Sequence, residues 1–122
     1  MIIAIDYHGT YSRDPEGFAA FVLLMKGRGH ECILVTGIED NGDWYAKEVR
    51  HAIGDTMRII FAAGAWKRRL VEAMGIHVDI WIDDTPEGVA HLSPSLVAIQ
   101  DQRTDKAIGA MGAIRTVGAD KA

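Results

Sequence analysis

Short apolar runs alternate with longer amphipathic stretches along most of the chain. The first run, Ile2 to Asp6, is followed by a stretch in which Asp14 and Pro15 are typical of a helix start and Gly29 of a helix end. Later runs and stretches repeat this order. We therefore predict strands at residues 2–6, 32–36, 57–62, 78–84 and 95–100, and helices at residues 14–29, 42–54, 66–75 and 86–92.

Strands that alternate with helices are connected by right-handed crossovers and form a parallel sheet with helices on both faces. The predicted fold is therefore α/β, a three-layer α/β/α sandwich around a Rossmann-like parallel sheet of about five strands. A length of 122 residues fits a single domain, residues 1–122. Because the loop after Gly9 is short and residues 37–65 already hold a helix and a strand, we expect no cap domain. Residues 101–122 are expected to be loosely structured.

Composition narrows the classes of function. With 48% hydrophobic and 25% charged residues, the chain is typical of a soluble globular protein, and no apolar run is long enough to span a membrane. Because the first residues form an apolar run without a basic leader, we expect a cytoplasmic protein with no membrane partner. Cys32 is the only cysteine, which excludes an internal disulfide and a cysteine-rich metal site.

Charge and histidine spacing disfavour two further ligands, nucleic acid and zinc. The net charge of −4 gives no general attraction for nucleic acid. The basic cluster from Lys67 to Arg69, together with Arg103, still leaves room for weak contacts with its phosphates, so nucleic acid stays open as a partner. Four histidines are scattered without ligand spacing, which disfavours zinc: His30, His51, His77 and His91.

Chemically active side chains stand at the carboxyl ends of the predicted strands or at the start of a helix. In open parallel sheets, ligands bind beyond these strand ends, near the point where the strand order reverses. Acidic groups, a hydroxyl and an ammonium are therefore expected to converge on one edge of the sheet: Asp6, Thr36, Lys67, Asp83 and Asp84.

Four of these five residues also have an alternative structural role. Asp6 and Thr36 could cap turns. Asp84 could be the N-cap of the helix that Pro86 begins. Lys67 stands beside two arginines and could belong to a solvated helix face.

The tryptophans Trp44, Trp66 and Trp81 are expected in the core, where large aromatic side chains bury most area. Trp66 adjoins Lys67 in the sequence. It therefore has an alternative role, in which it lines the rim of the site and stacks on a substrate.

Four short segments occur in an order that resembles the haloacid dehalogenase superfamily of phosphatases and their relatives. They are DYHGT from Asp6, LVTG ending at Gly37, WKRRL around Lys67 and WIDD ending at Asp84. The family is marked by Asp-x-Asp-Gly-Thr after the first strand, followed by a Ser or Thr, a Lys and paired acids. The match spans residues 2 to about 92 and looks like the small type without a cap domain.

The resemblance implies a phosphohydrolase in which Asp6 attacks phosphorus and forms an aspartyl-phosphate. Mg²⁺, the expected cofactor, would be held by Asp6, Asp83, Asp84 and the backbone carbonyl of His8. It would remove the repulsion between a carboxylate and a phosphate dianion in a poorly solvated cleft.

The phosphate would be bound by Thr36 Oγ and Lys67 Nζ, with Gly37 beside them, and Lys67 would also steady Asp6. Gly9 would let the chain leave the strand tightly and present backbone N–H groups to the same anion. An open site admits phosphorylated ends of nucleic acids, phosphoproteins and small molecules such as sugar phosphates. Another subunit of a homo-oligomer could supply a lid.

His8 departs from the family pattern, because the superfamily's phosphatases have a second Asp there that protonates the leaving group and then activates water. Imidazole, with an unperturbed pKa of about 6.5, could still act as acid and base. Three outcomes stay open: a phosphatase with a substituted acid/base, a slow enzyme that traps phosphate, or an Mg²⁺- and phosphate-binding module with little turnover. Attack on a carbon–halogen or carbon–phosphorus bond is disfavoured, since dehalogenation needs no metal and the paired acids argue for one.

Overall fold

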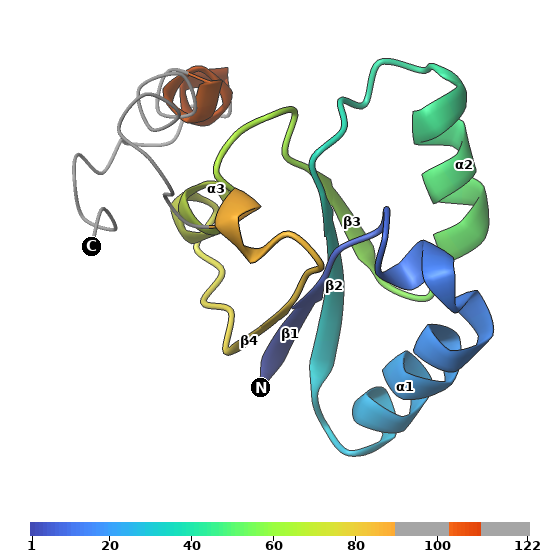
Figure 1. The fold of residues 1–122 in the computed structure, drawn as a ribbon. Helices are drawn as coiled ribbons and strands as arrows, with labels where there is room; N and C mark the ends of the chain where they lie inside the picture. The colour runs from blue at the N-terminus through green and yellow to red at the C-terminus, as the bar shows by residue number, and fades with distance from the viewer. Residues whose placement is uncertain (90–102, 111–122) are drawn as a thin grey trace.

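A computed structural model of the protein describes residues 1–89 and 103–110. Its strands form one sheet that is flanked by helices (Figure 1). Within the described ranges, no helix has the length and apolar composition needed to cross a membrane. In chain order the elements are β1 (Ile2–Ile5), the 3-10 helix η1 (Tyr11–Arg13), α1 (Pro15–Gly27), β2 (Glu31–Thr36), α2 (Trp44–Ile53), β3 (Arg58–Phe61), α3 (Lys67–Ala73), β4 (Ile80–Ile82) and the 3-10 helix η2 (Pro86–Gly88), and residues 103–110 form a further helix.

All strand pairs in the sheet are parallel, and the strand order is β3-β2-β1-β4. Ile5 in β1 is paired with Leu34 of β2 on one side and with Ile82 of β4 on the other. The α/β class and the parallel sheet are therefore confirmed, whereas the strand predicted at residues 95–100 lies outside the described residues. From β1 to β3 the strands are added on one side of β1, whereas β4 is added on the other side, so the strand order reverses between β1 and β4. In open parallel sheets, ligands bind at such a point of reversal.

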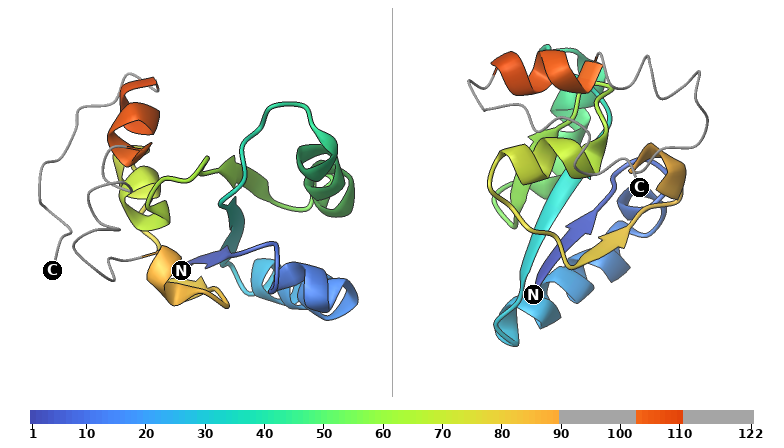
Figure 2. Two further views of the ribbon diagram at one scale, coloured as in Figure 1. Left: turned by 45° about the horizontal axis from the view of Figure 1, so that its top comes forward. Right: turned by 90° about the vertical axis from the view of Figure 1, so that its left-hand side faces the viewer.

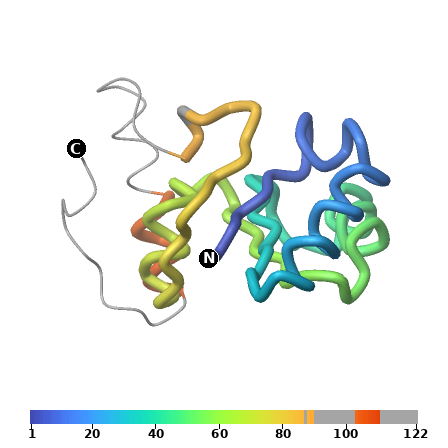
Figure 3. The backbone as a smooth tube through the Cα atoms, turned by 90° about the horizontal axis from the view of Figure 1, so that it is seen from below, coloured from blue at the N-terminus to red at the C-terminus, as the bar shows by residue number. Residues whose placement is uncertain are grey.

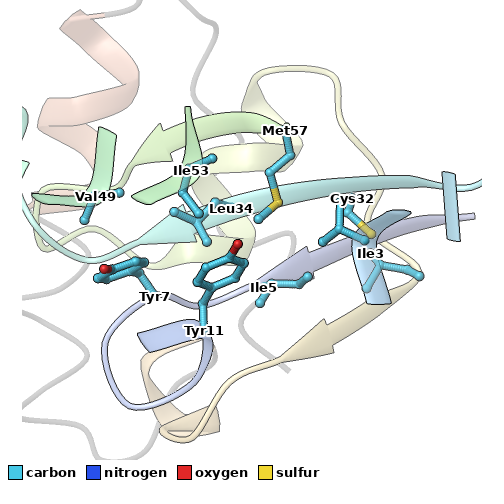
Figure 4. Packing of buried hydrophobic residues seen from close by; sticks show 10 residues of the cluster. Ile3, Ile5, Tyr7, Tyr11, Cys32, Leu34, Val49, Ile53 and Met57 are labelled. Carbon is cyan, nitrogen blue, oxygen red and sulfur yellow. The ribbon is translucent and has the colours of Figure 1, made fainter. Parts of the chain in front are cut away.

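The central strands β1 and β2 are buried on both faces, which explains their continuous apolar runs. Successive side chains point to opposite faces, so Ile5 and Leu34 pack in one cluster with α1 and α2, whereas Ala4 and Val35 pack in a second cluster with α3. Figure 4 shows the first cluster. Figures 2 and 3 show α1 and α2 on one side of the sheet, and α3 with residues 103–110 on the other.

Local sequence signals fix the starts of α1 and α2 where the sequence predicts them. The Asp14 carboxylate accepts a hydrogen bond from the Gly17 N–H at 3.1 Å, and Pro15 is the first helical residue of α1. The Asp43 carboxylate caps α2 in the same way, accepting from the Ala46 N–H at 3.0 Å. Both caps satisfy backbone donors that a helix start leaves without partners.

Residues 103–110 form a helix, although they fall in the segment 101–122 that the sequence predicts as loosely structured. Ile108 of this helix is buried in the same apolar cluster as Leu70 and Val71 of α3. The burial of Ile108 against α3 is a contact between distant parts of the chain, which local composition does not reveal. The rest of this segment lies outside the described residues.

The tryptophans do not share one environment. Trp66, directly before α3, is buried as predicted. Trp44, the first residue of α2, is 68% exposed, so the prediction that it lies in the core is wrong. The buried face of α2 is formed instead by Ala46, Val49 and Ile53.

The core position Leu34 is suited to a test of this packing. Leu34 has no exposed surface, so Leu34→Ala is expected to lower the free energy of unfolding by about 2–5 kcal/mol, through lost apolar contacts and the cavity left behind. Leu23→Ala is the matched control, because Leu23 on α1 is 72% exposed and its loss is expected to cost about 0.5 kcal/mol or less. Urea unfolding measures both changes, and equal losses would contradict the described core.

Candidate functional site

Three carboxylates meet at the reversal of strand order. Asp6 directly follows β1, and Asp83 and Asp84 directly follow β4, the neighbouring parallel strand. One carboxylate oxygen from each residue lies within 4.8 Å of the others. The predicted convergence of these acids is therefore present, and the donor set consists only of hard oxygen atoms, which suits a cation such as Mg²⁺ or Ca²⁺.

Lys67 joins two of these carboxylates. Its Nζ donates hydrogen bonds to Asp6 Oδ1 at 2.8 Å and to Asp83 Oδ2 at 2.7 Å, and all three side chains are buried. Lys67 is the first residue of α3, so the start of that helix is tied to the ends of β1 and β4. The alternative role of Lys67 on a solvated helix face is thus wrong.

Thr10, to which the sequence analysis assigns no role, links the acids on the other side. Its Oγ1 lies 3.4 Å from Asp6 Oδ2 and 3.5 Å from Asp84 Oδ1, and it accepts a hydrogen bond from the Asp84 N–H at 3.2 Å. A single hydroxyl proton can serve only one carboxylate at a time. Thr10 therefore holds the segment after β4 against the segment after β1, and the only sequence signal for it is its place in DYHGT.

Gly9 provides the space in which Asp84 lies. Its φ of +81° is in the left-handed region, and a Cβ at this position would lie 2.2 Å from Asp84 Oδ2. Its N–H donates to Ser12 Oγ at 3.1 Å. The structure therefore gives Gly9 a steric role beside Asp84, while its own N–H is already bonded within the loop.

The Asp83 carboxylate is oriented by the backbone that follows it. Asp83 Oδ1 accepts a hydrogen bond from the Thr85 N–H at 2.9 Å. The N-cap position of η2 belongs to Thr85, so the alternative role of Asp84 as the N-cap ahead of Pro86 is wrong.

Thr36 ends β2 on the same edge of the sheet. Its side chain is 1% exposed, and within the described part of the chain its Oγ1 has no hydrogen-bond partner. A buried hydroxyl without a partner costs free energy, so a ligand atom that bonded to it would remove that cost. Gly37 follows on the surface, and its carbonyl accepts from the Gly64 N–H at 3.0 Å in the loop that leads to Lys67.

His8, in the position where the sequence departs from the family pattern, is exposed. The centroid of its ring lies 4.9 Å from that of Tyr7 and 6.1 Å from that of Tyr45, both in edge-to-face arrangements. Its side chain therefore packs beside its neighbour Tyr7 and beside Tyr45 in the first turn of α2. Among the described residues, the group of acidic, histidine and cysteine side chains placed to hold a metal contains no histidine.

Electrostatics in the site favour an added cation. Burial raises the pKa of Asp6 above its usual value of 3.8, and the charge of Asp83 and a hydrogen bond with Asp84 add to the rise, while Lys67 opposes it. One ammonium faces three carboxyls, which leaves an excess of negative charge when all are ionised. A bound divalent cation would favour the ionised form of Asp6.

The helix at residues 103–110 supports the start of α3. Thr104 Oγ1, which is fully buried, accepts a hydrogen bond from the Trp66 N–H at 2.6 Å. Arg69 of α3 also pairs with Asp105 at 3.3 Å. These contacts hold the residue before Lys67 in place. Because Trp66 is only 3% exposed, its alternative role at the rim of the site, where it would stack on a substrate, is wrong.

Comparison of the chain with protein-family models, curated proteins and solved structures finds no match to any of them. The function is therefore inferred from the geometry of the site itself. That geometry brings three carboxylates and a buried ammonium together at the ends of β1 and β4, and a buried hydroxyl ends the neighbouring strand β2.

Removal of the ammonium tests its structural role. Lys67→Met is expected to lower the free energy of unfolding by about 3 kcal/mol or more, because it leaves buried carboxylates without their cation. Millimolar Mg²⁺ is expected to restore part of this loss in thermal unfolding, since a cation bound only to the folded state stabilises it.

Arg68→Met is the matched control for Lys67→Met. Arg68 is the next residue of α3 and pairs with Glu72 on the surface, so its loss is expected to cost about 0.5 kcal/mol or less. Equal losses in the two variants would show that Lys67 does not hold the site together.

Asp6→Asn tests the electrostatics. A raised pKa means that the folded state gains stability from protonated Asp6 below the usual pKa, and that this gain is lost as the pH rises through the raised value. Without added metal, Asp6→Asn is therefore expected to be more stable than the wild type at pH 7, by roughly 0.5–2 kcal/mol. The difference is expected to shrink towards pH 4, and urea unfolding at both pH values measures it. A variant less stable than the wild type at pH 7 would contradict this account.

Proposed function

We propose that the protein is an Mg²⁺-dependent phosphohydrolase of the haloacid dehalogenase kind, with Asp6 as the nucleophile. The observation that carries the proposal is the buried Thr36 hydroxyl, which lacks a partner among the described residues and lies on the same edge as the pair between Lys67 and Asp6. An anion with several oxygens could accept hydrogen bonds from both the hydroxyl and the ammonium. Phosphate is such an anion.

The donor set fits Mg²⁺, which would be held by Asp6, Asp83 and Asp84, with the backbone carbonyl of His8 as a further ligand implied by the family resemblance. When bound, the ion supplies positive charge that offsets the repulsion between phosphate oxygens and carboxylates. Thr10 and Gly9 serve this site by placing Asp84 beside Asp6.

The chain's own residues then divide the reaction between them. An Asp6 carboxylate oxygen attacks phosphorus, the bond between phosphorus and the leaving oxygen breaks, and that oxygen takes a proton. Lys67 and Thr36 hold phosphate oxygens throughout, with Gly37 beside them. Water then attacks the phosphorus of the aspartyl-phosphate, which releases phosphate and restores the Asp6 carboxylate.

His8 determines how fast these steps proceed, because it stands where the family's phosphatases have their acid/base. Its ring packs beside Tyr7 and Tyr45, and this observation favours a second candidate function, a phosphate- and metal-binding module with impaired catalysis. In the first candidate, the imidazole gives its proton to the leaving oxygen and later takes one from water.

The same proposal includes the layers of the domain, the kind of substrate, the oligomeric state and the cellular location. The complete domain would be a three-layer α/β/α sandwich with a fifth strand at residues 95–100, without a cap domain. Its open site would take a phosphorylated small molecule or an exposed phosphate on a macromolecule, and a second copy of the chain could cover it in a homo-oligomer. The proposed location is the cytoplasm.

Phosphate release from a panel of phosphomonoesters tests the proposal. Release is expected to require Mg²⁺, and Asp6→Asn is expected to lower it by at least about a thousandfold, because the variant lacks the nucleophile. Release without Mg²⁺, or equal release by Asp6→Asn, would contradict the assignment of the site.

His8→Asp separates the two candidates. If chemistry is limited by the acid/base position, the variant is expected to release phosphate roughly 10²–10⁴ times faster than the wild type, the contribution of a positioned acid/base group. His8→Asn is the matched control for His8→Asp. Asparagine is similar in size to aspartate, but its side chain cannot act as a general acid or base. A wild type that binds Mg²⁺ and phosphate without turnover, together with a gain in His8→Asp alone, would favour the binding module.

A further inference from the structure

Two exposed aromatic side chains next to His8, those of Trp44 and Tyr45, take no part in the proposed reaction. The centroid of the Tyr45 ring lies 6.1 Å from that of His8 and 5.1 Å from that of Trp44. His8 is exposed, and Trp44 and Tyr45 are 68% and 53% exposed. We name these three residues the aromatic rim. The rim extends from a loop residue two positions after Asp6 to the first turn of α2.

Neither Trp44 nor Tyr45 is needed to hold α2 on the sheet. The helix packs on the sheet through Ala46, Val49 and Ile53, and its N-cap is Asp43. Adjacent exposed aromatic rings leave a large apolar area in contact with water, and a ligand that covered them would recover free energy. Such rings are therefore typical of a binding surface.

The charges next to the rim limit what could bind there. Residues 37–43, which connect β2 to α2, include Glu39, Asp40 and Asp43 and no lysine or arginine, although Asp40 pairs with Arg50 of α2. A second phosphate, as in a nucleic-acid strand, would be repelled by the carboxylates of Glu39 and Asp43. A flat, uncharged ring would not be repelled, and it could stack on Trp44 or Tyr45.

The leaving group has to lie near the rim if His8 is the acid/base. His8 would then contact the leaving oxygen. It is two residues after Asp6 in the chain, and its ring lies beside that of Tyr45, so it connects the site with the rest of the rim. We propose that the aromatic rim binds a flat aromatic ring in the leaving group of the phosphorylated substrate, either an aryl group or a nucleobase. This inference rests on the proposed function, because the Asp6 site must hold the phosphate from which the ring extends.

Pairs of phosphonates, one member with an aromatic ring and one without, test directly whether the rim binds a ring. A phosphomonoesterase does not cleave their carbon–phosphorus bond, so each ligand stays intact during the measurement. Phenylphosphonate is compared with cyclohexylphosphonate, and an acyclic adenine nucleoside phosphonate with the same phosphonate lacking the base. Calorimetry with the full chain and Mg²⁺ measures each dissociation constant, and inorganic phosphate reports on the phosphate site alone. The aromatic member of at least one pair is expected to bind roughly tenfold tighter, the size of one stacking contact.

Variants of the rim complete the test. Trp44→Ala or Tyr45→Ala is expected to remove the preference for the aromatic member, while the affinities for the aliphatic member and for inorganic phosphate stay within about twofold. Tyr45→Phe keeps a ring and is expected to retain the preference. Leu23→Ala, on exposed Leu23 of α1, is the matched control and is expected to change nothing. Quenching of Trp44 fluorescence by the aromatic ligand, absent in Trp44→Ala, would locate the ring.

Each outcome bears on the inference. A preference in the first pair assigns an aryl group, one in the second pair a nucleobase, and either supports the rim if the alanine variants abolish it. Equal affinities within both pairs, or a preference that survives both alanine variants, would overturn the inference. If phosphate still binds in that case, the proposed function is not contradicted. Failure of inorganic phosphate and all phosphonates to bind with Mg²⁺ would overturn the proposed function, and the rim assignment with it.

Discussion

The paired hydrogen bonds from Lys67 to Asp6 and Asp83 are the interaction on which the rest of the site depends. They place a buried ammonium between carboxylates that follow neighbouring strands, where like charges would otherwise repel at short range. They also fix α3 to the point where the strand order reverses. Because one ammonium does not neutralise three carboxyls, the same arrangement that holds the edge together leaves it able to accept another cation.

The surrounding structure holds this charged centre in place. Parallel pairing keeps the ends of β1 and β4 in register, and Thr10 links the loops that follow them. On the far side of α3, the bond from the Trp66 N–H to Thr104 fixes the turn that presents Lys67. Trp44 and Tyr45 lie outside this centre and face solvent. In the proposed function, the charged centre would determine the chemistry and the exposed rim the choice of substrate.

Much of this arrangement follows from the sequence, because its signals are local. Apolar runs and caps such as Asp14 locate β1 to β4 and α1 to α3, and the strand-end rule by itself brings Asp6 and Asp83 together. Local patterns do not reveal contacts between distant segments of the chain. The bond from Trp66 to Thr104 spans 38 residues, and the link from Thr10 to Asp84 spans 74. The exposure of Trp44 likewise depends on which residues of α2 face the sheet, and helical spacing alone did not resolve it.

Binding of beryllofluoride, a tetrahedral mimic of a phosphoryl group that adds to a carboxylate oxygen, tests the central claim most directly. It asks whether Asp6 accepts a phosphoryl-like group, and it does not depend on how fast His8 supports turnover. The account predicts bound fluorine resonances in ¹⁹F NMR spectra that require Mg²⁺ and disappear in Asp6→Asn. Spectra that show only free beryllofluoride with Mg²⁺ present, or bound resonances that persist in Asp6→Asn, would contradict it.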